Sequence, residues 1–229
     1  MRTALTIAGS DSGGGAGIQA DLRTFTVIGV YGTSAITAVT AQNTLGVTAV
    51  LALPPDLVVA QIDAVVADLG ADAVKIGMLA NAAIAAAVAD ALARHRLSPV
   101  VLDPVMVAKG GASLIDEAAV AVLRSRLFPL ATVVTANIPE AEALTGITVT
   151  DIAGARRAAS AMVGAGARAA IVKGGHLSGD AVDVLFDGAA FTEFSHRRIA
   201  TVHTHGTGCT FASAIAAHPC RSIHCCSGV

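Results

Sequence analysis

A cysteine stands inside a glycine-rich segment near the end of the sequence. Residues 204–210 read THGTGCT, and an apolar helical pattern follows them directly. The first turn of a helix leaves backbone N–H groups unpaired, so Gly206, Thr207 and Gly208 are predicted to form an anion site. A helix N-terminus also stabilises a thiolate, which predicts a lowered pKa for Cys209. The alternative is that Cys209 is a small buried residue that fills the start of the helix.

Polar residues and glycines also follow the other strand-like apolar runs. In chain order they are Gly9 with Asp11, Gln42, Gly77 with Met78, Asp103 with Pro104, Asn137 with Glu140, and Lys173 with the two glycines after it. In open α/β sheets the ligand binds beyond the carboxyl ends of the strands, so these positions are predicted to surround one site. Together they supply a cation, carboxylates that could hold Mg²⁺ through water, and an anion cradle with an internal base. Phosphoryl transfer requires these parts.

Each of these residues also has a plainer interpretation. Asp103 before a proline is typical of a turn, and Lys173 before two glycines fits a solvated loop. Asn137 with Glu140 three positions later fits a helix cap followed by an acidic first turn. The sequence contains no G-x-x-x-x-G-K-[ST] motif, which excludes a P-loop kinase.

A second motif suggests a rival function. Residues 15–20 match the G-x-G-x-x-A form of the dinucleotide fingerprint and follow a strand-like run. The fingerprint also needs an acidic residue about 20 positions further on, which holds the ribose. Residues 33–43 contain no carboxylate. The sequence therefore disfavours a dinucleotide site.

Strand-like and helix-like segments alternate along most of the chain. The predicted strands are 5–8, 47–53, 73–76, 100–102, 132–135 and 169–172, and the predicted helices are 18–25, 56–66, 82–94 with Asn81 as N-cap, 118–127 and 152–163. This alternation predicts an α/β fold, with a mostly parallel central sheet flanked by helices on both faces. Residues 181–186 and 190–195 predict an antiparallel hairpin at the sheet edge.

Composition limits the partners. The 229 residues are 54% hydrophobic and 14% charged, which fits one large domain. The formal net charge of -2 comes without a basic run, so no nucleic-acid partner is expected. No span reaches the roughly 18 apolar residues of a membrane helix, and no signal peptide pattern is visible, so we expect a cytoplasmic protein without a membrane partner.

Three of the four cysteines, Cys220, Cys225 and Cys226, lie among the last ten residues. This distribution is unlike that of a disulfide framework, and the C-x-x-C pair of a zinc site is missing.

Six motifs in the same order resemble the hydroxymethylpyrimidine/phosphomethylpyrimidine kinases of thiamine biosynthesis, which belong to the ribokinase-like superfamily. They are residues 8–21 (AGSDSGGGAGIQAD), 40–44 (TAQNT), 75–79 (KIGML), 102–106 (LDPVM), 172–176 (VKGGH) and 204–210. The resemblance implies a single three-layer ribokinase-like kinase domain over residues 1–217, ATP and Mg²⁺ as cofactors, and a homodimer. It also implies two reactions in one site. ATP phosphorylates the hydroxymethyl group of 4-amino-5-hydroxymethyl-2-methylpyrimidine, and then the resulting monophosphate.

The resemblance implies roles for the substrate-binding residues. Gln42 would read the ring nitrogen and the amino group of the pyrimidine through the acceptor and donor of its amide. Gly9 would allow close backbone approach, while Met78 and Val105 would pack on the ring.

It implies roles for the catalytic residues as well. Cys209 stands where sugar kinases of the superfamily have an aspartate, and would take the hydroxyl proton. The N–H groups of residues 206–209 would stabilise the transferred phosphoryl group, and Lys173 would neutralise the nucleotide phosphates. Mg²⁺ would be organised, through waters, by Asp103, Asn137 and Glu140.

The chain departs from the family pattern at two places. Ala136 stands where the family usually has proline, which we expect to change loop rigidity more than chemistry. Beyond Ala217 the family continues with further helices, whereas residues 218–229 do not match them, so we expect an aberrant or truncated end. Two alternative functions stay open: a pyridoxal kinase-type activity, and a non-catalytic ligand-binding remnant of the same fold.

Overall fold

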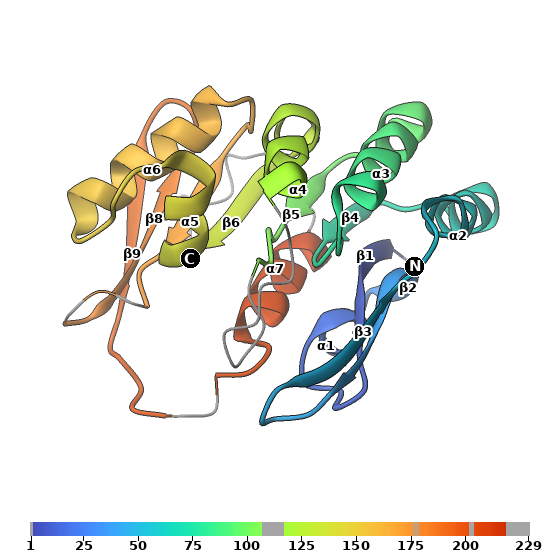
Figure 1. The fold of residues 1–229 in the computed structure, drawn as a ribbon. Coiled ribbons are helices and arrows are strands. Elements are labelled where there is room, and N and C mark those ends of the chain that lie inside the picture. Colours follow the sequence, from blue (N-terminus) through green and yellow to red (C-terminus); the bar gives the residue numbers. More distant parts are fainter. Residues whose placement is uncertain (1, 107–116, 176, 178, 202–203, 219–229) are drawn as a thin grey trace.

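The computed structural model describes residues 2–106, 117–175, 177, 179–201 and 204–218. Within them a sheet runs in the order β3-β2-β1-β4-β5-β6-β7-β8-β9 (Figure 1). The strands are β1 Thr3–Asp11, β2 Tyr31–Gln42, β3 Val47–Ala52, β4 Ala73–Ile76, β5 Val100–Leu102, β6 Val133–Asn137, β7 Ala170–Lys173, β8 Ala181–Phe186 and β9 Phe191–His196. The helices are α1 Gly17–Ile28, α2 Pro55–Asp68, α3 Ala82–His95, α4 Glu117–Val122, α5 Ile138–Thr145, α6 Ile152–Gly164 and α7 Thr207–Ala217.

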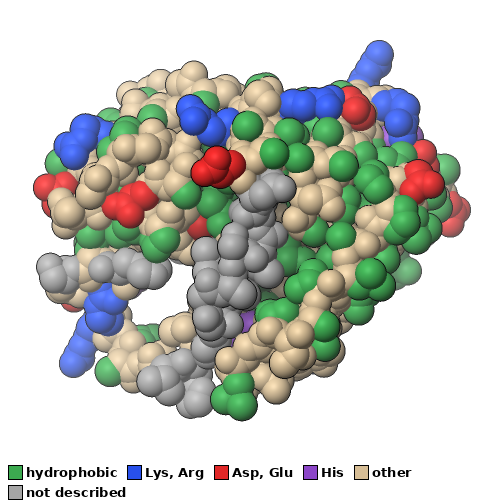
Figure 2. Space-filling model, in the orientation of Figure 1, with side chains coloured by type: hydrophobic (Ala, Val, Ile, Leu, Met, Phe, Trp, Pro, Cys, Tyr) green, Lys and Arg blue, Asp and Glu red, His purple; other side chains and the backbone are tan. Residues whose placement is uncertain are grey.

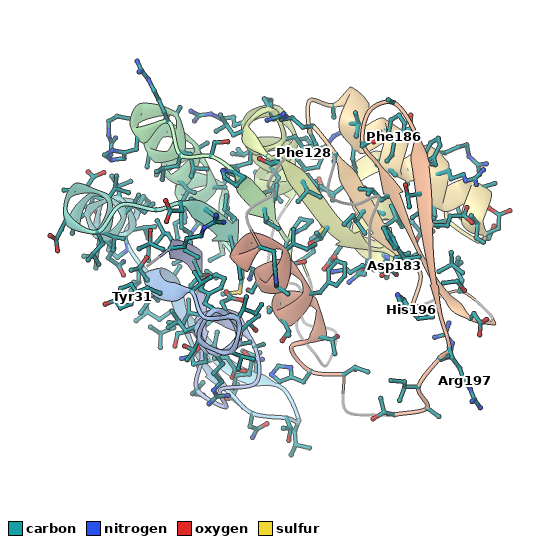
Figure 3. All side chains as sticks on the ribbon, turned by 180° about the vertical axis from the view of Figure 1, so that it is seen from behind. Tyr31, Phe128, Asp183, Phe186, His196 and Arg197 are labelled. Carbon is teal, nitrogen blue, oxygen red and sulfur yellow. The ribbon has the colours of Figure 1, made fainter. Side chains whose placement is uncertain are left out.

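Helices cover the sheet on both faces, as the alternating pattern predicted. Strand residues alternate between two apolar cores: Val100 and Leu102 pack with the α2–α6 side, while Val101 packs with α1 and α7. Figure 3, seen from behind, shows α7 together with α1 on the sheet face opposite to α2–α6. The parallel strands β2-β1-β4-β5-β6-β7 therefore end together beside the start of α7.

Most predicted elements are present, but β2 and α5 were not among the predicted segments, and two further regions differ from the prediction. Asn81 caps α3 as predicted, because its side chain accepts the Ile84 N–H at 2.9 Å. The hairpin β8–β9 is antiparallel and forms one edge, but β3 also pairs antiparallel with β2 and makes the opposite edge antiparallel too. The predicted helix 118–127 is regular only over α4, and continues as a π turn at Leu123–Leu127 and a 3₁₀ turn at Phe128–Leu130.

The visible surface (Figure 2) carries charges of both signs. On the face shown in Figure 2, Lys and Arg side chains are spread out and mixed with Asp and Glu. No helix in the described part of the chain is long and apolar enough to cross a membrane. The predicted tail lies almost entirely outside the described residues, as do Cys220, Cys225 and Cys226.

Candidate active site

The strand ends and the start of α7 enclose a pocket of about 670 Å³. Every residue to which the sequence analysis gave a binding or catalytic role lines this pocket: Gly9, Gln42, Met78, Asp103, Val105, Asn137, Glu140, Lys173, Gly206, Thr207, Gly208 and Cys209. These residues come from positions up to two hundred apart in the chain. The fold brings them together because parallel strands share one carboxyl edge.

The start of α7 has the geometry of an anion site. Gly206 occupies the N-cap position with φ 80°, and no side chain among the described residues caps the helix. A Cβ atom on Gly206 would lie 1.8 Å from the carbonyl oxygen of Gly15, so only glycine fits there. A Cβ atom on Gly208 would lie 3.4 Å from Lys173 Nζ and 3.7 Å from Asp103 Oδ2, so both charged groups face the first turn of α7.

Asp103 is a carboxylate with one unused oxygen. It is 2% exposed, and its Oδ1 accepts from Thr135 Oγ1 and Lys173 Nζ, each at 3.3 Å. Asp103 Oδ2 has no hydrogen-bond partner within the described structure. A buried carboxylate oxygen without a partner is costly, so this atom indicates a place for a further polar group.

Lys173 remains charged in this setting. Burial alone would lower its pKa, but the negative charges of Asp103 and Glu140 raise the pKa above its usual value.

Asp183, labelled in Figure 3, reaches the pocket from β8. Its Oδ1 accepts the Gly174 N–H at 2.8 Å and so holds the loop that follows Lys173.

Asn137 and Glu140 form the helix cap that was the plainer interpretation. Asn137 Oδ1 accepts the Glu140 N–H at 2.9 Å, and Glu140 Oε2 accepts the Asn137 N–H at 2.8 Å, which makes a capping box for α5. The two residues therefore build the helix and line the pocket at the same time. Within the described residues no group of three or more His, Cys, Asp or Glu side chains could hold a metal ion directly.

The carboxyl group of Glu140 is predicted to make stability depend on pH. Burial, and then the charge of Asp103, raise its pKa from 4.5 to about 7. The folded state therefore binds this proton more tightly than the unfolded state, and Glu140 costs stability as pH rises from about 4.5 through 7. Glu140→Gln should recover on the order of 1 to 3 kcal/mol at pH 8 and little at pH 5. Urea unfolding at both pH values measures this, and an equal effect at the two would contradict it.

The structure corrects the prediction for Cys209. Its side chain is buried, and burial raises the pKa of the thiol above its usual value. Lys75 and the Gly17 N–H lower the pKa, but burial, together with the carboxylates of Asp103 and Asp21, outweighs them. The predicted lowering of the pKa is therefore wrong, because the tertiary surroundings outweigh the helix N-terminus.

A buried ion pair below Cys209 was missed by the sequence analysis. Lys75 Nζ lies 3.0 Å from Asp21 Oδ2, and both side chains are fully buried. Thr6 donates to Asp21 Oδ2 and Ser213 donates to Asp21 Oδ1, each at 2.6 Å. Although burial alone would lower it, the pKa of Lys75 is raised by Asp21, Cys209 and Asp103. The available signal was a lysine inside the apolar run of β4.

A second polar cluster lines the pocket around Gln42. Asp11 accepts the N–H groups of Gly13, Gly15 and Ala16, and its Oδ2 lies 2.9 Å from His205 Nε2. Burial acts to raise the pKa of Asp11, but these hydrogen bonds hold it below its usual value. Asp11 was among the predicted site positions, but its pairing with His205 was not predicted, because 194 positions separate the two residues.

Gly9 and Met78 lie together beside this cluster. A Cβ atom on Gly9 would lie 2.4 Å from Met78 Cε, so the glycine makes room for the methionine side chain. Both line the pocket with Val105, which gives its wall an apolar part.

Residues 11–225 match the family model described as phosphomethylpyrimidine kinase. The chain belongs to this family. It is 52% identical over 225 residues to the hydroxymethylpyrimidine/phosphomethylpyrimidine kinase of Bacillus subtilis, covering 96% of this chain and 83% of that protein. It is 59% identical over 215 residues to the thiamine biosynthesis bifunctional protein ThiED of Geobacter sulfurreducens, covering 93% of this chain but only 44% of that longer protein.

Solved structures agree with this assignment. Phosphomethylpyrimidine kinase from Clostridium difficile 630 is 43% identical, with a TM-score of 0.84 over 95% of this chain and 90% of that one. An ADP complex of Bacillus subtilis pyridoxal kinase is 40% identical, with a TM-score of 0.88 over 95% of this chain and 84% of that one. The resemblance to this kinase family and the ribokinase-like α/β fold are thereby confirmed, and the chain is a phosphotransferase.

Proposed function

We propose that this chain uses ATP to phosphorylate 4-amino-5-hydroxymethyl-2-methylpyrimidine and then its monophosphate, in thiamine biosynthesis. Membership of the family and the names of the curated relatives support the reaction. The observation that carries it is that one pocket is lined by Gln42 and also by Lys173 and the start of α7. One pocket thus holds a recognition group for a polar ring beside groups that attract phosphate.

The chemical step assigns a role to each group at the start of α7. The hydroxymethyl oxygen forms a bond to the γ-phosphorus of ATP as the bond to the β–γ bridging oxygen breaks, and ADP leaves. Lys173 and the backbone of Gly206, Thr207 and Gly208 stabilise charge on the transferred group. The hydroxyl proton passes to the sulfur of Cys209. Because the pKa of Cys209 is raised, only a minor fraction is thiolate at neutral pH, and the rate should increase with pH.

The residues present fit Mg²⁺ held partly through water. Asp103 Oδ2 is buried without a hydrogen-bond partner among the described residues and faces the first turn of α7, whereas Glu140 Oε2 and Asn137 Oδ1 already serve the capping box. Mg²⁺ keeps several waters and needs only one or two carboxylates beside the nucleotide phosphates. Asp103 would hold the ion, with Asn137 and Glu140 orienting its waters. When bound, the ion neutralises charge on the phosphates.

Pyridoxal kinase activity is the second candidate. It is favoured by the similarity to the Bacillus subtilis pyridoxal kinase and to a Staphylococcus aureus pyridoxal kinase in complex with AMP-PCP and pyridoxal, which is 33% identical with a TM-score of 0.85 over 95% of this chain and 80% of that one. ADP release should be followed with the pyrimidine alcohol, its monophosphate and pyridoxal in parallel. Turnover of the first two supports the proposal. Turnover of pyridoxal alone would replace it, and binding without turnover would indicate the non-catalytic remnant.

A homodimer through β2 and β3 is also proposed. Val39 pairs with Leu51 and Ala41 with Ala49, and all four are exposed on one face of these strands. An apolar face of this kind at a sheet edge favours a second copy of the chain. Sedimentation velocity at micromolar concentration gives the mass, and a monomer throughout would reject the dimer.

We further propose a cytoplasmic location, in keeping with ATP as the phosphoryl donor.

A further inference from the structure

The side-chain amide of Gln42 lies between two hydrogen-bonding groups of this chain. One of the two terminal atoms of the amide lies 3.1 Å from Thr40 Oγ1, and the other lies 3.5 Å from His205 Nε2. The oxygen and nitrogen of a glutamine amide have nearly the same shape, so which is which must follow from the hydrogen bonds around them. Here the neighbours of the amide decide the assignment.

His205 presents a donor to Gln42. Its Nε2 lies 2.9 Å from Asp11 Oδ2, and the Asp11 side chain is 2% exposed. An ionised carboxylate only accepts hydrogen bonds, so Nε2 of His205 carries a proton, whatever the charge of the ring. An NH₂ group of Gln42 would meet this N–H donor to donor. The amide oxygen, in contrast, is attracted to this N–H and can form the long branch of a shared hydrogen bond, at 3.5 Å beside the 2.9 Å bond to Asp11.

Thr40 presents an acceptor to Gln42. Its hydroxyl group lies 2.9 Å from the carbonyl oxygen of Ser10 and 3.1 Å from the Gln42 amide. A hydroxyl has one proton, and the carbonyl of Ser10 can only accept it. The oxygen of Thr40 is then free to accept from the amide NH₂. Both ends therefore favour one arrangement, with the amide nitrogen towards Thr40 and the amide oxygen towards His205.

We propose that Thr40 and His205 hold the Gln42 amide in this orientation and thereby set which way round an aminopyrimidine ring binds. The inference rests on the proposed function. One N–H and one lone pair of the amide are used by Thr40 and His205. The remaining N–H and lone pair form an edge that pairs with a ring nitrogen and the amino group on the adjacent carbon. The ring nitrogen lies on the Thr40 side, and the amino group lies on the His205 side.

This orientation has a consequence for the reaction. In the substrate, the hydroxymethyl group sits on the carbon next to the one that bears the amino group. With the amino group on the His205 side, the hydroxymethyl group is directed further that way. Gly206 and the start of α7 with Cys209 follow His205 directly in the chain and line the same pocket. A reversed amide would turn the ring over and direct the hydroxyl away from Cys209. Thr40 and His205 are therefore positioning residues for specificity.

The test compares two ligands by calorimetry. One is the 4-amino substrate, and the other is its 4-oxo analogue, whose ring N–H and carbonyl reverse the donor and acceptor. If the amide is held in one orientation, the ratio of the two dissociation constants should favour the amino compound by roughly tenfold to a hundredfold. The 4-oxo compound presents its donor and acceptor in reverse and leaves buried groups without hydrogen bonds. Thr40→Val and His205→Phe should each reduce this ratio towards one, while Thr40→Ser, which keeps the hydroxyl, should retain it. Both disruptive variants should also lower kcat and KM for the pyrimidine together, as the ring binds unproductively.

Thr33→Val is the matched control. Thr33 is another buried threonine of β2, and its hydroxyl donates only to the carbonyl of Ala4, at 3.3 Å. Thermal melting shows whether each variant folds. If only one of Thr40→Val and His205→Phe folds, that variant alone is enough for the test. If the wild type binds the amino compound without preference, or if both variants keep the full ratio, the orientation is wrong and the proposed function stands. If the wild type binds neither compound but turns over pyridoxal, the proposed function fails and this inference fails with it.

Discussion

Replacing Cys209 by alanine should lower kcat by roughly 10² to 10⁴, the usual scale for loss of a general base, with little change in KM. The side chain of Cys209, the third residue of α7, lines the pocket beside the charges of Lys75 and Asp103. Cys209→Asp should recover part of the loss, because a carboxylate can take the same proton. Steady-state kinetics on the three proteins measures both effects.

The pH profile separates a base from a packing residue. Burial raises the pKa of the thiol, so the thiolate fraction grows as pH rises. The wild-type rate should therefore increase by up to about tenfold per pH unit in the neutral range, while the alanine variant should lose this dependence. Thr210→Ala, at the exposed next position of α7, is the control and should change neither rate nor profile. An alanine variant with full activity would leave catalysis to Lys173 and the backbone of α7.

Local patterns foretold those parts of the site that depend on neighbours in the chain. The strand β4, the cap at Asn81 and the glycine-rich start of α7 are each read from a few adjacent residues, and each is present. The capping box at Asn137 shows a limit of this kind of reading. One pattern supports both a helix cap and a pocket residue, and the structure uses it for both.

Long-range contacts explain what the sequence analysis missed. The pKa of Cys209 depends on burial and on Asp103, which a reading of α7 alone does not include. The pairing of Asp11 with His205 joins β1 to the loop before α7, and nothing in either segment indicates the other. Lys75 was noted only as part of a motif in an apolar strand, although it occupies the base of the pocket. Periodicity shows which face a residue lies on, but not which charge it will meet.

Asp21→Asn should reduce the free energy of unfolding by about 3 to 5 kcal/mol, because it leaves the ammonium of Lys75 buried without a countercharge. Both side chains of the pair are fully buried, at 3.0 Å. The carboxylate of Asp21 also accepts from Thr6 on β1 and from Ser213 on α7. Since Ser213 lies one turn beyond Cys209, the loss should loosen the helix that carries the site, and turnover should decrease as well.

A second change isolates the charge from the hydrogen bonds. In the double variant Asp21→Asn with Lys75→Met, the asparagine can still accept from one hydroxyl and donate to the other. Neither of the two positions then carries a buried charge. This variant should therefore recover most of the lost stability, as replacement of a buried pair by apolar groups often does. Asp63→Asn is the control, since Asp63 pairs with Arg94 on the surface with side chains 44% and 49% exposed and should cost at most about 1 kcal/mol. Urea unfolding decides the matter: a double variant no more stable than Asp21→Asn would show that Lys75 itself, rather than its unpaired charge, holds the core together.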